Sequence, residues 1–342
     1  MTVNWTPKEN FMAVVNGEIP QSIPIYNMGM PFPQGGHPTR SIKPNLFPND
    51  TSRTPQGGYD IWGVHYVANE ETNYASLPEP GNFILDDITK WRDIIVAPEV
   101  PDVDWEAMAK ADYEKAKIDR DTTAVILNAG FSPFQRIVAF MGFSEALCAL
   151  YEEPEEVKAM YEYLCDFYLP IIEKSIDYYK PDIFYMADDS ASKYNPFFSP
   201  EIYEEIYLPV YQRLAKPAND RGIPIGFHNC GRCEPFVDMM VSFGVRTWDP
   251  CQTLNDLDGI KKKYQGRLAL AGGWEFVNLG EDPSRDEIAQ SIRDTIDRYA
   301  AGGGYMFAGG VLGRAGDQQA KDTQDFVRAT ALEYCDHYYE KH

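Results

Sequence analysis

The stretch Ile223-Pro-Ile-Gly-Phe-His-Asn-Cys-Gly-Arg-Cys233 is a short apolar run that stops at a histidine, two cysteines and a glycine. Side chains two residues apart in a strand point to the same side of the sheet, so we expect His228 and Cys230 to face one side together at the strand's end. Imidazole and thiolate are ligands that zinc binds well. The stretch therefore predicts a buried strand that presents two metal ligands to one cavity, and it leaves the remaining ligands open.

The strand predicted at 224–227 belongs to a series of apolar runs that alternate with longer amphipathic segments. This alternation is typical of repeated βα units with a parallel sheet. From residue 122 onward it predicts six strands, at 123–128, 182–187, 224–227, 245–248, 268–271 and 305–308. Two earlier runs, at 23–27 and 61–67, bring the expected number of strands to eight.

Eight parallel strands can close into a (β/α)8 TIM barrel, which leaves no open sheet edge. A doubly wound sheet normally carries a glycine-rich phosphate loop after its first strand, and neither G-x-G-x-x-G nor G-x-x-x-x-G-K-S/T occurs here. We therefore predict the α/β class and a single TIM-barrel domain over residues 1–342. The Pro-, Gly- and Asn-rich segment 30–58 is expected to be a long irregular loop over the barrel mouth, after the first strand.

Composition narrows the possible partners and location. The chain has 31 Lys and Arg against 52 Asp and Glu, and its net charge of −21 would repel nucleic acid and anionic lipid. No apolar run approaches the roughly 20 residues that cross a bilayer, and no secretory signal is visible. The six cysteines are scattered, unlike a secreted disulfide framework. We expect a cytoplasmic protein that binds neither nucleic acid nor membrane.

In a TIM barrel, functional residues follow the carboxyl ends of the strands. The polar or aromatic residues at such positions are Asn27, Asn128, Asp188, Asp189, His228, Cys230, Asp249, Cys251, Trp274 and Glu275, together with Met28. Because Asp188 and Asp189 are adjacent, at most one of them points inward, and we favour Asp189 as an acid, a base or a metal ligand. Cys251 is a further candidate ligand.

Several segments resemble the uroporphyrinogen decarboxylase superfamily, and the likeness runs nearly end to end. They are Lys8-Glu-Asn-Phe through Ile23-Pro-Ile-Tyr, Pro154-Glu-Glu-Val, Ser199-Pro-Glu-Ile-Tyr with Leu208-Pro209, and Ile223 to Gly231. The resemblance implies a (β/α)8 barrel. It also implies one of two activities: decarboxylation of a tetrapyrrole, or zinc-dependent methyl transfer to a corrinoid protein.

The decarboxylase branch carries an Arg-Gln-Ala-Gly-Arg run after the first strand, whose arginines hold the carboxylates of the substrate. Here the corresponding stretch reads Tyr26-Asn-Met-Gly-Met-Pro-Phe-Pro, without forked cationic donors. The aspartate of the second-strand signature of that branch has no clear counterpart either. These differences argue against decarboxylation.

The methyltransferase branch bears His-x-Cys after the fifth strand, which His228-Asn-Cys230 matches, and a later cysteine, which is absent. A metal would therefore need Cys251, Asp189, Glu275 or another donor to complete its ligands. Cys230-Gly-Arg-Cys-Glu-Pro-Phe, with Trp248-Asp-Pro and Gly272-Gly-Trp-Glu, looks closest to members that demethylate aryl methyl ethers.

The resemblance thus predicts a methyltransferase that moves a methyl group from a small methylated substrate, an aryl methyl ether, to a Co(I) corrinoid on a partner protein (O-demethylation). Zinc would be held by His228, Cys230 and Cys251, with Asp189 as catalytic acid. The expected substrate contacts are Tyr26, Met28, Tyr194, Trp274 and Glu275. The alternatives are a tetrapyrrole decarboxylase and a non-catalytic barrel that binds a corrinoid or its protein. The sequence leaves the methyl donor, the metal occupancy, the corrinoid partner and the oligomeric state open.

Overall fold

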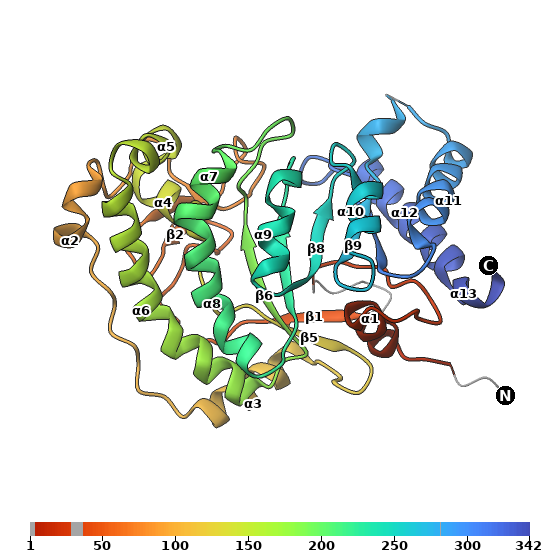
Figure 1. The fold of residues 1–342 in the computed structure, drawn as a ribbon, viewed down its shortest axis with the longest axis horizontal. Coiled ribbons are helices and arrows are strands. Elements are labelled where there is room, and N and C mark those ends of the chain that lie inside the picture. Colours follow the sequence, from red (N-terminus) through yellow and green to blue (C-terminus); the bar gives the residue numbers. More distant parts are fainter. Residues whose placement is uncertain (1–3, 29–36, 281) are drawn as a thin grey trace.

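A curled parallel sheet surrounded by helices forms the centre of the molecule (Figure 1). The computed structural model describes residues 4–28, 37–280 and 282–342. Within these residues, seven strands pair in parallel in the order β1 (Thr39–Ile42), β5 (Ala124–Leu127), β6 (Ile183–Asp188), β7 (Ile225–Asn229), β8 (Val245–Cys251), β9 (Ala269–Gly273) and β10 (Tyr305–Ala308). Ile25 forms a parallel bridge to Phe307 of β10 and adds an eighth segment. The predicted TIM-barrel type of α/β fold is confirmed.

The six strands predicted from residue 122 onward are all present, and β6, β7, β8 and β9 end later than expected. β7 continues through His228 to Asn229, and β8 continues through Asp249 to Cys251. Several candidate site residues are therefore part of the sheet rather than of the loops that follow it. Their backbone positions are fixed by the hydrogen bonds between neighbouring strands.

The prediction of a barrel strand at 61–67 is wrong. β3 (His65–Val67) lies in a separate antiparallel sheet with β2 (Gly58–Tyr59) and β4 (Leu77–Pro78). The second barrel strand is β1, inside the segment expected to be an irregular loop, and residues 30–36 of that segment lie outside the described residues. The sequence of β1, Thr-Arg-Ser-Ile, has no apolar run, so only its pairing with β5 reveals it.

Helices cover the outer face of the sheet. The longer ones are α1 (Pro7–Asn16), α3 (Trp105–Ala116), α4 (Pro133–Met141), α5 (Phe143–Glu152), α6 (Pro154–Tyr179), α8 (Leu208–Asp220), α11 (Arg285–Ala300) and α12 (Gln318–Cys335). The short ones are α2 (Trp91–Ile94), α7 (Pro200–Ile202), α9 (Val237–Ser242), α10 (Leu257–Lys263) and α13 (Tyr338–Lys341), with single turns at Ile88–Lys90, Tyr203–Tyr207, Glu234–Phe236 and Phe276–Leu279. None of the helices in the described ranges is both long enough and apolar enough to span a membrane.

Alternation along the strands separates an inner core from an outer one. In β5, Ala124 and Ile126 belong to a cluster inside the barrel, whereas Val125 and Leu127 join the larger cluster under the helices. Helix α1 contributes Phe11 to the inner cluster, and its backbone near Lys8 is hydrogen-bonded to Thr122, just before β5. This helix therefore closes the amino-terminal end of the barrel and leaves the carboxyl end for a site.

Candidate metal centre

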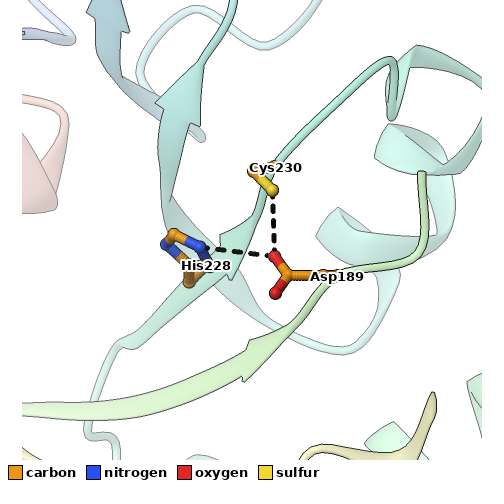
Figure 2. A group of neighbouring side chains, drawn as sticks. All are labelled: Asp189, His228 and Cys230. Carbon is orange, nitrogen blue, oxygen red and sulfur yellow. Dashed lines mark hydrogen bonds and ion pairs between the residues drawn. The ribbon is translucent and has the colours of Figure 1, made fainter. Parts of the chain in front are cut away.

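Three potential metal ligands lie together at the carboxyl ends of two neighbouring strands. Asp189 follows β6, His228 is near the end of β7, and Cys230 directly follows β7. One ligand atom from each residue lies within 4.8 Å of the others. Figure 2 shows the imidazole and the thiol on the same side, both directed at the carboxylate of Asp189. The parallel pairing of β6 with β7, which aligns Asp188 with Asn229, brings the three together.

The contacts within this trio join at one carboxylate oxygen. Cys230 Sγ donates to Oδ1 of Asp189 at 3.0 Å, and His228 Nε2 lies 3.5 Å from the same oxygen. Sulfur, nitrogen and carboxylate oxygen are all donors that zinc accepts, and catalytic zinc sites commonly use three protein ligands and one open position. The residues present therefore fit the metal that the family resemblance implies.

The second nitrogen of His228 is held by another acid. His228 Nδ1 lies 3.0 Å from Oδ2 of Asp249, a buried residue of β8 that stands opposite His228 in the strand register. The hydroxyl of Tyr185 donates to both oxygens of Asp249, at 3.0 and 2.8 Å. The buried Tyr26 lies close to both Tyr185 and Asp249. A chain of buried polar groups thus fixes the histidine from inside the barrel.

These partners set the protonation of the site. Burial lowers the pKa of His228, but hydrogen bonds to Asp189 and Asp249 outweigh burial and raise this pKa to about 12. Burial raises the pKa of Asp189, but its bonds with His228 and Cys230 bring the pKa below the usual value. The pKa of Cys230 is raised by burial and by the charge of Asp189. A cation bound by the trio would take the place of protons on the imidazole and the thiol.

Asp188 and Asp189 serve different elements. The buried carboxylate of Asp188 accepts hydrogen bonds from the backbone amides of Phe134 and Gln135, at 2.8 and 3.0 Å, and from the Tyr211 hydroxyl at 2.7 Å. It thereby satisfies the free amides at the start of α4. Burial raises its pKa to about 6, although these hydrogen bonds oppose the shift. Only Asp189 of the pair faces His228 and Cys230.

The predicted ligand Cys251 stands apart from this trio. Its buried thiol, in β8, donates to the carbonyl oxygen of Trp248 at 3.1 Å. The group of metal-binding side chains found within the described residues consists of Asp189, His228 and Cys230 and does not include Cys251. The candidate ligand set in the structure therefore contains Asp189 instead of the predicted Cys251.

The predicted substrate-contacting residues are spread over three places. Tyr26 is buried in the inner cluster, as described above. Met28 and Tyr194 are exposed, at 38% and 68% of their surface. Trp274 donates from Nε1 to Ser291 Oγ at 2.9 Å. Trp274 and Glu275 line a cavity of about 300 Å³ between the ends of β8 and β9 and helices α10 and α11, and the residues described as lining it include none of the metal-binding trio.

Sequence reasoning misses two residues of the network behind His228. Asp249 is recognised only as a strand-end residue, and Tyr185 of β6 lies within an apolar run typical of core. A signal for Asp249 exists in β8, where the buried polar residues Thr247 and Asp249 alternate with the buried Trp248. Polar residues at every second position of a buried strand indicate a polar barrel interior.

The fold and the cluster together define a barrel protein with its candidate site at the carboxyl ends of the strands, as the resemblance implied. The family described as uroporphyrinogen decarboxylase (URO-D) matches residues 99–317, and the chain belongs to this family. No curated protein matches the chain.

Two solved structures are similar to the chain. A methyltransferase from Methanosarcina mazei is 12% identical, with a TM-score of 0.61 over 97% of this chain and 99% of that chain. A protein described as a vitamin-B12 independent methionine synthase from Listeria monocytogenes is 14% identical, with a TM-score of 0.38 over 64% of this chain and 66% of that chain. At such low identity, the match to the Methanosarcina mazei protein concerns the fold alone.

Proposed function

We propose that this protein is a methyltransferase that transfers a methyl group from a small methylated substrate, an aryl methyl ether, to a Co(I) corrinoid carried by a partner protein. The observation that carries the proposal is the meeting of His228, Cys230 and Asp189 at the barrel mouth. The His-x-Cys pair is the feature by which the sequence resembles the methyltransferase branch of this family. The similarity in fold to a methyltransferase over nearly the whole chain is compatible with that role.

In this proposal Asp189, His228 and Cys230 hold a zinc ion. When bound, zinc supplies Lewis-acid stabilisation of the negative charge that develops on the departing oxygen. Cys251 is a fourth candidate, and its thiol would first have to leave the carbonyl of Trp248. The role of Asp189 as catalytic acid stays a prediction, and its lowered pKa makes the carboxylate better suited to hold a metal than to donate a proton.

The residues behind the trio position the imidazole. Asp249 accepts a hydrogen bond from Nδ1–H of His228. This bond selects the tautomer that leaves Nε2, at the mouth, free to bind a metal. The hydrogen bonds from the Tyr185 hydroxyl compensate the burial of the Asp249 carboxylate. Burial raises the pKa of both tyrosines, and the charge of Asp249 adds to this effect, so both remain neutral donors.

The corrinoid protein would approach the carboxyl end of the barrel, because α1 closes the other end. The roles of Tyr26, Met28, Tyr194, Trp274 and Glu275 as substrate contacts stay predictions. Tyr26 is the one of the five that touches the hydrogen-bond network behind His228.

The test is methyl transfer from 2-methoxyphenol to free cob(I)alamin, followed by the absorbance of methylcobalamin. We expect turnover that depends on zinc, and a loss of at least about 100-fold in Cys230→Ser, since the interaction removed stabilises the leaving group. Cys148→Ser, which changes an exposed cysteine of α5, is the matched control and should keep full activity.

Three outcomes would overturn the proposal. Equal rates in Cys230→Ser and in the control would remove the trio from the reaction. Carbon dioxide release from a porphyrinogen substrate, without zinc or corrinoid, would instead favour the tetrapyrrole decarboxylase. Tight corrinoid binding with no transfer from any methyl donor would favour a non-catalytic barrel.

A further inference from the structure

A larger cavity lies on the other side of the barrel wall. It has a volume of about 530 Å³, within the range of small-molecule sites. Its walls come from the end of β1, the segment 43–53, helix α3 and helix α6. In Figure 1, α3 and α6 flank the part of the sheet that holds β1 and β5.

This cavity is separate from the barrel interior. Ile42 of β1 and Ile171 of α6 line it, and both belong to the outer core rather than to the cluster around Tyr26 and Tyr185. Of the described residues that line it, none is part of the metal-binding trio. A molecule bound here would therefore not occupy the site proposed for methyl transfer.

The lining carries four cationic and two acidic residues. The cationic residues that line the cavity are Lys43, Arg53, Lys115 and Arg136. Within the described ranges, the first three form no ion pair. This concentration of cations contrasts with the net charge of −21 of the whole chain.

The two acids that line the cavity already accept hydrogen bonds from the protein. Asp50 accepts from the amide and the hydroxyl of Ser52. Asp112 accepts from the amide of Asn45 at 3.1 Å and from the Tyr179 hydroxyl. These contacts hold the acids in place, and the cations remain available to a bound anion.

Arg136 provides a fixed donor at the base of this arrangement. Its side chain is only 16% exposed and forms an ion pair with Asp60, which is 4% exposed. Asp60 is itself held by the backbone amides of Trp62 and Val64. The Nε atom of Arg136 is buried and has no hydrogen-bond partner. Nε has almost no accessible surface, so a ligand in the cavity would meet the exposed part of the Arg136 side chain rather than Nε–H.

Apart from Ser41 and Asn45, the rest of the lining is apolar or aromatic. Phe47, Ile61, Tyr168 and Ile171 border the same cavity as the four cations. An inorganic anion would leave this apolar surface unused, whereas an organic acid would contact both parts. Arginine forks match the geometry of a carboxylate particularly well.

We propose that this cavity binds an organic carboxylate with an aromatic body, at a site distinct from the barrel mouth. The carboxylate faces the guanidinium and ammonium groups, and the ring packs against the apolar wall. The site goes beyond the proposed methyl transfer and does not depend on it.

The proposal is tested by isothermal titration calorimetry with 2-naphthoate, 2-naphthamide and inorganic phosphate as probes. We expect one 2-naphthoate per chain, and at least about tenfold weaker binding of the neutral amide and of phosphate, because each lacks one of the two kinds of contact. Arg53→Gln combined with Lys115→Gln should weaken 2-naphthoate binding about tenfold or more. Lys110→Gln, in the same helix as Lys115 but outside the cavity, is the matched control.

Two further variants keep the test decisive. His228→Ala should bind 2-naphthoate as the unaltered protein does, which separates this site from the barrel mouth. Arg136→Lys, with its thermal midpoint measured to verify folding, keeps the charge but replaces the planar guanidinium with an ammonium group and should weaken binding. Equal affinity for the acid and the amide, unchanged affinity in the double variant, or no binding at millimolar concentration would overturn the proposal.

Discussion

The two sites lie on opposite sides of the barrel wall and are built in opposite ways. At the barrel mouth, the groups come from β6, β7 and β8 and the residues directly after them, and each nitrogen of His228 already faces a carboxylate. In the outer cavity, the cations come from helices and from the segment 43–53, and three of them have no partner acid in the described part of the chain. The mouth is preorganised by neighbouring strands, whereas the cavity has a surplus of charge that a ligand can neutralise.

The largest effect is expected when a metal ligand is removed from the barrel mouth. His228→Ala should lower zinc affinity by at least about 100-fold, because a direct ligand and the anchor to Asp249 are lost together. Zinc per chain, measured by elemental analysis after dialysis against a weak chelator, should fall from one to near zero. One zinc per chain in the variant would show that the metal is held elsewhere.

A second change leaves the ligands in place and removes only their support. Asp249→Asn cannot hold His228 Nδ1–H with the same charge, and we expect zinc affinity and methyl transfer to fall about 10- to 100-fold. Asp238→Asn, at an exposed position of α9 paired with Lys263, is the control. If the two variants bind zinc equally well, Asp249 does not position the histidine.

The success of sequence reasoning differs between the parts of the chain. The strands from β5 to β10 are predictable because each contains buried apolar residues and alternates with an amphipathic segment, whereas β1 has the sequence Thr-Arg-Ser-Ile and is a strand only through its pairing. The proximity of His228 to Cys230 follows from their spacing. Their proximity to Asp189 requires parallel pairing of β6 with β7, which the barrel prediction supplied.

Other features depend on register and tertiary packing, which the local pattern does not contain. Asp249 becomes the partner of His228 because these two residues stand opposite each other in β7 and β8. The outer cavity requires contacts among the segment 43–53, α3 and α6, which are far apart in the sequence. Its lysines and arginines look like ordinary surface charges until these elements are assembled.

A smaller effect is expected at Tyr185, which contacts Asp249 and not a candidate metal ligand. Tyr185→Phe removes the donor to both oxygens of Asp249 but keeps the ring in the inner core. We expect methyl transfer to fall about threefold to tenfold, since one buried hydrogen bond to a carboxylate is lost. Tyr211→Phe, which removes a hydroxyl from Asp188 instead, is the matched control and should affect stability more than activity. A larger loss of activity in the control would place the critical carboxylate at Asp188.

The smallest expected effect separates the two sites by their response to salt. Raising the ionic strength from about 0.01 M to 0.15 M shortens the Debye length from about 30 Å to 8 Å. The affinity for 2-naphthoate should then fall about twofold to fivefold, because exposed Lys43, Arg53 and Lys115 supply much of the attraction. The affinity for zinc, which direct contacts with the partly buried trio would hold, should change less. The weak affinity for the neutral 2-naphthamide should not change. Calorimetry at both ionic strengths measures all three, and a salt-independent affinity for 2-naphthoate would mean that the cations do not contribute to its binding.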